Sequence, residues 1–314
     1  MPSDIGHFQH RVLTSTFTPD VRVHHPYHTP LGLVLQSNYY YGGWREADGT
    51  LHVFERKFTG PMTAGLWLMN ARGGKVSVEP ASIKTVRGEV KREYGDERNL
   101  LHGSILDSVG GGGSGLELET TLGKMKWREG DVLSLDGRLV GPGVQIHAPD
   151  DDQPVLYVSQ LYRVSGRVLG DDVEGFVFCD HVYWRPGYEW KEYVVFHKLQ
   201  LGWEAFANEY TDGSIEWGHL CLGADGFNFA AVADQNGGVA LDGNVTGGLD
   251  VAEGDWVPRG KYRTSSGHEY TFTVEEGGKL SEFSEARWGG YRAQCGYTRR
   301  TGDEREIKLG FSWM

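Results

Sequence analysis

The chain has 314 residues, with 31 Lys and Arg against 43 Asp and Glu, which gives a formal net charge of -12. This length is enough for two domains of about 150 residues, each with its own core. Because the balance is acidic and no basic stripe is interleaved with aromatic residues, we expect neither nucleic acid nor an anionic membrane surface as a partner.

No stretch of the sequence has the pattern of a targeting or spanning segment. The first twenty residues lack an apolar core of signal-peptide length, and no apolar run is long enough to cross a bilayer. The expectation is a soluble cytoplasmic protein with no integral membrane segment. Cys179, Cys221 and Cys295 are far apart and odd in number, which favours reduced, buried thiols over disulfides or a zinc site.

Near the start of the chain, three histidines lie close together around Pro26. A metal site needs ligands that converge on one point, and no carboxylate or cysteine accompanies His24, His25 and His28. Loop histidines are therefore favoured over a metal cluster. The sequence predicts no metal and no cofactor.

Short strands and tight turns recur from residue 31 onward. Residues 37–44 and 50–58 flank the turn at Asp48-Gly49, which is a strong hairpin signal. Further turns at Asp212-Gly213, Asp225-Gly226 and Asn236-Gly237 are almost evenly spaced, as in a closed or nearly closed barrel. With 46 Gly and an aromatic share of 12%, the sequence predicts an all-β protein.

The central stretch, residues 156–190, contains an acid in an unusual setting. Gly175 and Pro186 bound an apolar and aromatic run without helical spacing, which predicts a strand. Side chains on a strand alternate between its two faces. Asp180 therefore shares one face with four apolar side chains, those of Phe176, Phe178, Val182 and Trp184.

Burial of Asp180 among these rings would raise its pKa and favour the neutral acid, a proton donor. The alternative is that the strand frays at Cys179 and Asp180 caps the turn that continues through Arg185, and the residues alone leave both open. His181 would form a dyad with Asp180 only if a bulge brought both side chains to one face.

The order Tyr157-x-Ser159, then Ser165-Gly166, then Gly175 to His181 with Trp184 behind resembles the central motif of the carotenoid 1,2-hydratase and AttH-like family. That group includes kievitone hydratase-like and Diels-Alderase-like members. The chain departs from the pattern at Phe178, where a Trp is usual. The resemblance implies two lipocalin-like antiparallel β-barrels in tandem, in residues 1–155 and 156–314, with residues 150–152 as the linker and the motif opening the second barrel.

The same resemblance implies a cofactor-independent hydratase or lyase acting at a C=C bond of a hydrophobic small molecule, such as a terpenoid or polyketide. Asp180, with His181, is the candidate catalytic group. Candidate substrate-binding residues are Tyr157, Phe178, Tyr183, Trp184, Trp190 and Trp217. Two alternatives stay open: a cyclase of the Diels-Alderase type that acts by folding its substrate, and a non-catalytic carrier of an apolar ligand. The sequence does not define an oligomeric state.

Overall fold

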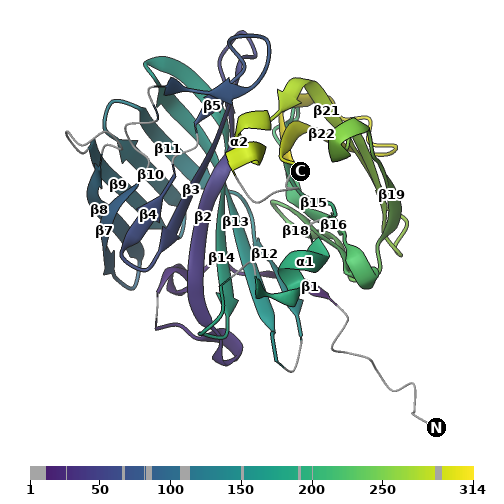
Figure 1. Cartoon of the computed structure of the whole chain (residues 1–314), viewed down its shortest axis with the longest axis horizontal. Helices are drawn as coiled ribbons and strands as arrows, with labels where there is room; N and C mark the ends of the chain where they lie inside the picture. Colours follow the sequence, from purple (N-terminus) through teal and green to yellow (C-terminus); the bar gives the residue numbers. More distant parts are fainter. Residues whose placement is uncertain are drawn as a thin grey trace.

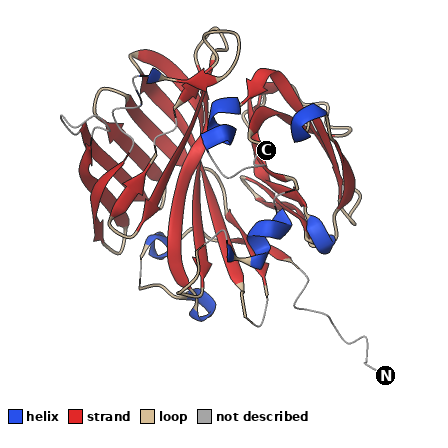
Figure 2. Ribbon diagram, in the orientation of Figure 1, coloured by secondary structure: helices blue, strands red, loops and turns tan. Residues whose placement is uncertain are grey.

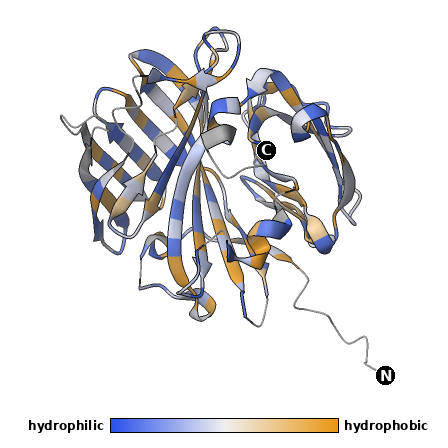
Figure 3. Cartoon of the chain, viewed as in Figure 1, coloured by the Kyte–Doolittle hydropathy of each residue, from blue (hydrophilic) through white to orange (hydrophobic). Residues whose placement is uncertain are grey.

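The computed structural model describes residues 12–25, 27–65, 68–80, 82, 87–106, 114–149, 152–189, 192–199, 201–286 and 292–314. The chain is nearly all β, with two antiparallel sheets lying side by side (Figures 1 and 2). The predicted fold class is confirmed. Apolar and polar residues alternate along many strands, as Figure 3 shows. Successive side chains point to opposite faces of a sheet, and one face is more buried than the other.

The first sheet contains fourteen strands among the described residues. They are β1 (Leu13–Phe17), β2 (Val34–Arg45), β3 (Leu51–Thr59), β4 (Met62–Ala64), β5 (Met69–Asn70), β6 (Ser77–Val78), β7 (Arg87–Tyr94), β8 (Arg98–Leu106), β9 (Ser114–Thr121), β10 (Lys124–Glu129), β11 (Leu133–Leu139), β12 (Gly143–Ala148), β13 (Val155–Val168) and β14 (Asp171–Trp184).

Ten of these described strands form a closed barrel. The long hairpin of β13 and β14 closes it, since β14 pairs with β13 along its whole length and with β2 on its other edge. β13 in turn pairs with β11 along one half and with β12 along the other. The central motif therefore lies in the first sheet and does not open the second, which differs from the expected boundary after residue 155. The reason is that β14 has a partner strand of the first sheet on each edge, β13 on one and β2 on the other.

The second sheet contains nine strands among the described residues. In chain order they are β15 (Trp203–Tyr210), β16 (Ile215–Leu222), β17 (Asn228–Asp234), β18 (Gly237–Asp242), β19 (Thr246–Asp250), β20 (Arg259–Arg263), β21 (Glu269–Lys279), β22 (Gln294–Arg300) and β23 (Ile307–Trp313). Its edge strands are β18 and β19, which meet through the short connection 243–245 without a shared ladder in the described residues. The sheet is thus curled but open, whereas even turn spacing predicted a barrel closed or nearly so.

Helices are short. They are α1 (Val194–Leu199) and α2 (Ser281–Ala286), with 3₁₀ turns η2 (Val21–His24), η3 (Pro30–Gly32), η6 (Ala224–Gly226) and η7 (Glu253–Asp255). Within the described part of the chain, none of the helices has the length and apolar character needed to cross a membrane.

Three of the four buried cores among the described residues are large, and they follow from strand alternation. The first barrel is filled by side chains such as Trp44, Phe54 and Trp127. The concave inner face of the second sheet forms a smaller core around Phe206 and Phe272. The largest core, which we call the inter-sheet core, lies where the outer faces of the two sheets pack together. The candidate site belongs to this inter-sheet core.

Candidate functional site

Strand β14 directs Asp180 into the inter-sheet core. Phe176, Phe178, Val182 and Trp184 all belong to that core, as alternation along the strand predicted. The side chain of Asp180 is fully buried among them, with 0% relative exposure. Because the strand stays paired on both edges through Asp180, the alternative of a frayed strand end with a turn cap is not what the structure shows.

Neighbouring strands place hydroxyl groups around this carboxyl. In the pairing register, Asp180 lies between Ser159 of β13 and Tyr39 of β2. Tyr41 follows two residues along β2 and so shares the same face. From β13, the Tyr157 hydroxyl donates a hydrogen bond to Asp180 Oδ2.

Burial raises the pKa of Asp180 from 3.8 to about 7. The hydroxyls of Ser159, Tyr157 and Tyr41 act in the opposite direction, because they stabilise the carboxylate. Desolvation is the larger effect. Asp180 therefore has a substantial neutral, protonated population near pH 7, as a proton donor requires.

The second sheet brings His219 of β16 to the same place. Its ring centroid lies 5.6 Å from that of Tyr157, 5.5 Å from that of Trp203 and 5.9 Å from that of Phe178. Burial lowers the pKa of His219 from 6.5 to about 3, so the imidazole is neutral. A neutral imidazole offers one donor and one acceptor nitrogen.

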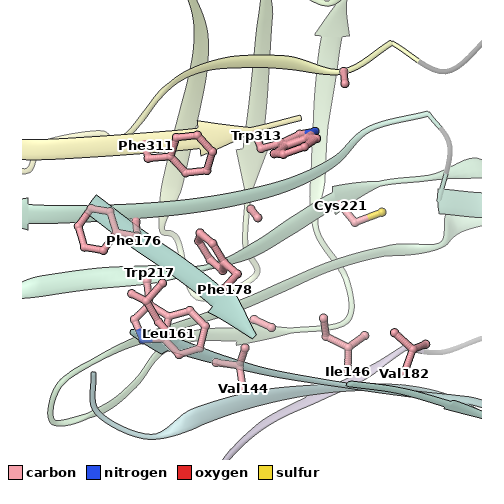
Figure 4. Packing of buried hydrophobic residues seen from close by; sticks show 14 of the residues in the cluster. Val144, Ile146, Leu161, Phe176, Phe178, Val182, Trp217, Cys221, Phe311 and Trp313 are labelled. Atoms are coloured by element: carbon pink, nitrogen blue, oxygen red, sulfur yellow. The ribbon is translucent and has the colours of Figure 1, made fainter. Parts of the chain in front are cut away.

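Phe178 connects the two sides of the inter-sheet core. Its ring stacks on Tyr41 at 5.2 Å and lies 6.2 Å from Trp217 of β16 and 6.5 Å from Phe311 of β23. Figure 4 shows Phe178 surrounded by side chains that come from both sheets. Asp180 is thus next to several aromatic faces, which can stabilise positive charge.

Several buried polar atoms at this interface have no hydrogen-bond partner within the described residues. They are Nε1 of Trp217 and both ring nitrogens of His219. An unsatisfied buried polar group costs about 1–3 kcal/mol. Trp217 and His219 lie on one face of β16, which is the arrangement expected where a ligand or bound water completes the hydrogen bonds.

The rings beside the carboxyl are partly exposed. Tyr157, Tyr41, Tyr39 and Trp203 pack against the inter-sheet core but retain intermediate exposure. Asp180 is buried beneath them. The site therefore lies near the surface along the junction between the sheets.

His181 does not join Asp180. The register runs without a shift from Asp180 to His181, and the irregularity in the pairing with β2 falls later, between Val182 and Tyr183. Without a bulge between them, neighbouring side chains point to opposite faces, so the expected dyad is not formed.

Tyr183 also faces away from the inter-sheet core. It belongs to a small core beneath η2, where its hydroxyl donates to the carbonyl of Val23 at 2.6 Å. The ring of His28 lies 6.5 Å away, and the ring of His25 packs on Tyr94. These contacts give Tyr183 a structural role.

Two other predicted residues lie apart from the carboxyl. Trp184 is on the Asp180 face but farther along β14, where its Nε1 donates to the carbonyl of Tyr188 at 3.0 Å and its ring lies 5.9 Å from Tyr193. Trp190 lies outside the described residues. Of the six predicted binding residues, Tyr157 therefore contacts Asp180, Phe178 lies two residues away on the same face of β14, and Trp217 packs near Phe178.

The sequence did not single out Tyr41, Ser159 or His219 as site residues. His219 is two residues from Trp217, so alternation alone places both on one face of β16. What the sequence does not reveal is that this face packs on β14. Among the described residues, no group of three or more His, Cys, Asp or Glu side chains is arranged to hold a metal ion.

Comparisons with known proteins give structural neighbours only. No family model matches the chain, and no curated protein matches its sequence. An AttH-like protein from Nitrosomonas europaea is similar in structure, with 14% identity, a TM-score of 0.46, and coverage of 100% of this chain and 95% of that one. Kievitone hydratase from Nectria haematococca is similar with 8% identity, a TM-score of 0.41, and coverage of 97% of each chain.

These two proteins are of the kinds named in the resemblance drawn from the central motif. At such identities and TM-scores, no residue role and no activity carries over from them to this chain.

Proposed function

We propose that the protein is a cofactor-independent hydratase or hydro-lyase that acts at a C=C bond of a hydrophobic small molecule, such as a terpenoid or polyketide. The observation that supports this most is Asp180, a buried carboxyl with a pKa of about 7 against aromatic rings of the inter-sheet core. A buried acid that is part neutral near pH 7 suits proton transfer to carbon.

The reaction balances with one acid and one water. The O–H proton of Asp180 forms a C–H bond at one alkene carbon, while the π electrons of the double bond supply that bond and leave a cation on the other carbon. The ring faces of Phe178 and Trp217 stabilise this cation. Water then bonds to the cation and returns a proton to the Asp180 carboxylate, so the net change is addition of water. Dehydration is the same sequence reversed.

The remaining groups have distinct roles in this proposal. The Tyr157 hydroxyl donates to Oδ2 of Asp180, so Oδ1 is the oxygen that carries the transferable proton in the neutral acid. His219 and Trp217 offer unpartnered ring nitrogens that can position the attacking water or a substrate oxygen. His181 and Tyr183 have no part in it, because they face away from Asp180.

The test uses Asp180→Asn with a panel of terpenoid and polyketide alkenes in heavy water. Asparagine keeps the shape and removes the transferable proton, so turnover is expected to fall at least ~100-fold while ligand affinity stays within a few fold. Mass spectrometry of the wild-type product should find deuterium on the protonated carbon. His181→Asn changes the adjacent buried residue on the opposite face and is the matched control, with turnover close to wild type.

Other outcomes separate the alternatives. A converted substrate with near-normal turnover in Asp180→Asn would rule out the acid role and favour a cyclase that works by substrate folding. Tight binding of an apolar ligand with no conversion by the wild type would identify a carrier. Equal losses in Asp180→Asn and His181→Asn would point to damage of β14 and contradict a specific role for Asp180.

A further inference from the structure

The imidazole of His219 is covered by rings from both sheets and not by its neighbours in the ladder. On either side of it lie Ala205 of β15 and Ala231 of β17, whose side chains end at Cβ and do not reach over the ring. The ring centroids around it are those of Trp203 at 5.5 Å, Tyr157 at 5.6 Å and Phe178 at 5.9 Å. His219 is fully buried, and neither ring nitrogen is exposed to solvent. Access to it therefore depends on these rings.

Tyr157 and Trp203 form the outer part of this cover. Tyr157 comes from β13 of the first sheet and Trp203 from β15 of the second, and their ring centroids are 4.8 Å apart. Both side chains keep intermediate exposure, whereas Phe178 is fully buried. The Tyr157 hydroxyl also donates to Asp180. Contact between the two half-exposed rings therefore closes the junction of the sheets beside both His219 and the acid.

Of these two residues, Trp203 is the less firmly held. It is the first residue of β15, and its backbone pairs with Cys221 of β16, whereas the ladder with β23 begins only at Ala205. Tyr157 lies in the middle of the first sheet and is paired on both edges, with β12 and with β14. A residue at a strand end with one paired edge opens at lower free energy than a residue of a central strand. Opening of the junction is therefore expected at Trp203.

We propose that Trp203 determines the size of the substrate that reaches Asp180, and that it does so by turning away from Tyr157. In the closed state, which the structure describes, the indole packs on Tyr157, His219 and Phe229. In the open state the indole lies in solvent, and an unsaturated apolar substrate replaces its contacts with the rings of Tyr157 and Phe229. This inference rests on the proposed function, since it assumes that the reaction takes place at Asp180.

Labelling with diethyl pyrocarbonate measures the opening without any substrate. The reagent modifies neutral imidazole, and burial keeps His219 neutral by lowering its pKa, so the labelling rate depends on access. His181 is the internal reference, because it is also fully buried and lies on β14, which is paired on both edges. In wild type, mass spectrometry of peptides should find His219 labelled at least ~10-fold faster than His181, since a strand end opens more often than a central ladder.

Trp203→Ala removes the indole, and Trp256→Ala is the matched control. Trp256 is also half-exposed and follows β19 of the second sheet, where its ring contacts Lys279 and Arg292. Trp203→Ala should raise the labelling rate of His219 by about 10-fold or more, because the loss of one aromatic pair alone corresponds to about 2- to 10-fold. Trp256→Ala should leave that rate unchanged, and His181 should be labelled as slowly as in wild type in both variants.

Turnover of the alkene panel tests the effect on substrate size. In Trp203→Ala, kcat/KM of the largest alkenes should rise about 10-fold relative to that of the smallest, the lower end of what one methylene contributes to discrimination. Trp256→Ala should leave this ratio as in wild type.

Three results would overturn the proposal. In wild type, His219 could be labelled no faster than His181, or as fast as His102, whose side chain is partly exposed. Trp203→Ala and Trp256→Ala could accelerate the labelling equally, which would indicate general loosening. The kcat/KM ratio could stay unchanged in Trp203→Ala. Because labelling involves no turnover, it can contradict the opening of Trp203 while Asp180→Asn supports the acid role, and the reverse.

Discussion

Asp180 links the chemistry of the site to the stability of the protein. Its pKa is raised from 3.8 to about 7 because burial disfavours the charged form. Between these values the folded state binds more protons at this residue than the unfolded state does. Stability therefore decreases as pH rises from about 4 through 7, and the full cost of the buried charge is present above pH 7.

This predicts that Asp180→Asn is more stable than wild type at pH 8 and close to it at pH 4. A shift of this size corresponds to at most about 4 kcal/mol, since one pKa unit is about 1.4 kcal/mol. Urea unfolding of both proteins across this pH range measures the difference. The pKa of Glu204 is also raised by burial. Because Glu204 is present in both proteins, its contribution to the difference in stability largely cancels. If the difference in unfolding free energy between the two proteins did not change with pH, Asp180 would have an ordinary pKa.

Alternation along one strand predicted the apolar neighbours of Asp180 on β14, and a raised pKa was one of the two alternatives that the residues left open. The groups from other strands could not be predicted in the same way. Tyr41 and Ser159 reach Asp180 through pairing register, and His219 reaches it through packing of one sheet on another. Register and packing depend on residues far apart in the sequence, which no local pattern encodes.

The β13–β14 hairpin positions the carboxyl because it is fixed on both edges. The strands β14 and β2 approach each other closely at Gly175. A Cβ at this residue would lie 2.1 Å from the carbonyl oxygen of Gly43 and 2.7 Å from Cα of Trp44 on β2. Backbone atoms cannot move aside without opening the ladder that closes the barrel. The sequence motif contains this glycine, and the structure gives its physical reason.

Gly175→Ala is therefore expected to destabilise the protein by about 1–3 kcal/mol, within the range of overpacked cores. Gly123→Ala is the matched control in the same barrel, because a Cβ there meets nothing within 4 Å, and its effect should stay within about 0.5 kcal/mol. Urea midpoints of the two variants give the comparison. Similar midpoints would mean that β14 and β2 separate more easily than their close approach indicates.

For the molecule as a whole, turn spacing and alternation predicted the all-β class correctly, because both are local properties of strands. Barrel closure is not local. The first barrel is closed by β14 pairing with β2, residues more than a hundred positions apart, while β18 and β19 meet at a short connection without a ladder. The sequence therefore predicted barrels but not which strands complete them, nor that the acid lies between the sheets.

The inter-sheet core makes the two sheets one cooperative unit. The ring of Phe311 on β23 packs directly on Gly43 of β2, where a Cβ would lie 2.3 Å from the ring. At the edge of this core, Arg45 of β2 bonds to Glu275 of β21 at 2.8 Å, and Arg163 of β13 bonds to Glu209 of β15 at 2.5 Å. Apolar packing supplies most of the coupling, because in a largely buried ion pair the cost of desolvation offsets much of the attraction.

Phe311→Ala should weaken this coupling by about 3–5 kcal/mol, the usual cost of removing a buried Phe side chain. In wild type, native-state hydrogen exchange should give similar opening free energies for the first barrel and the second sheet. In Phe311→Ala, strands β20 and β21 should exchange at lower free energy than β9 and β10, since the open second sheet depends more on its partner. Phe54→Ala removes an equally buried ring from inside the first barrel and serves as control. If Phe311→Ala lowered the opening free energies of both sheets equally, the second sheet would depend on the inter-sheet core no more than the first barrel does.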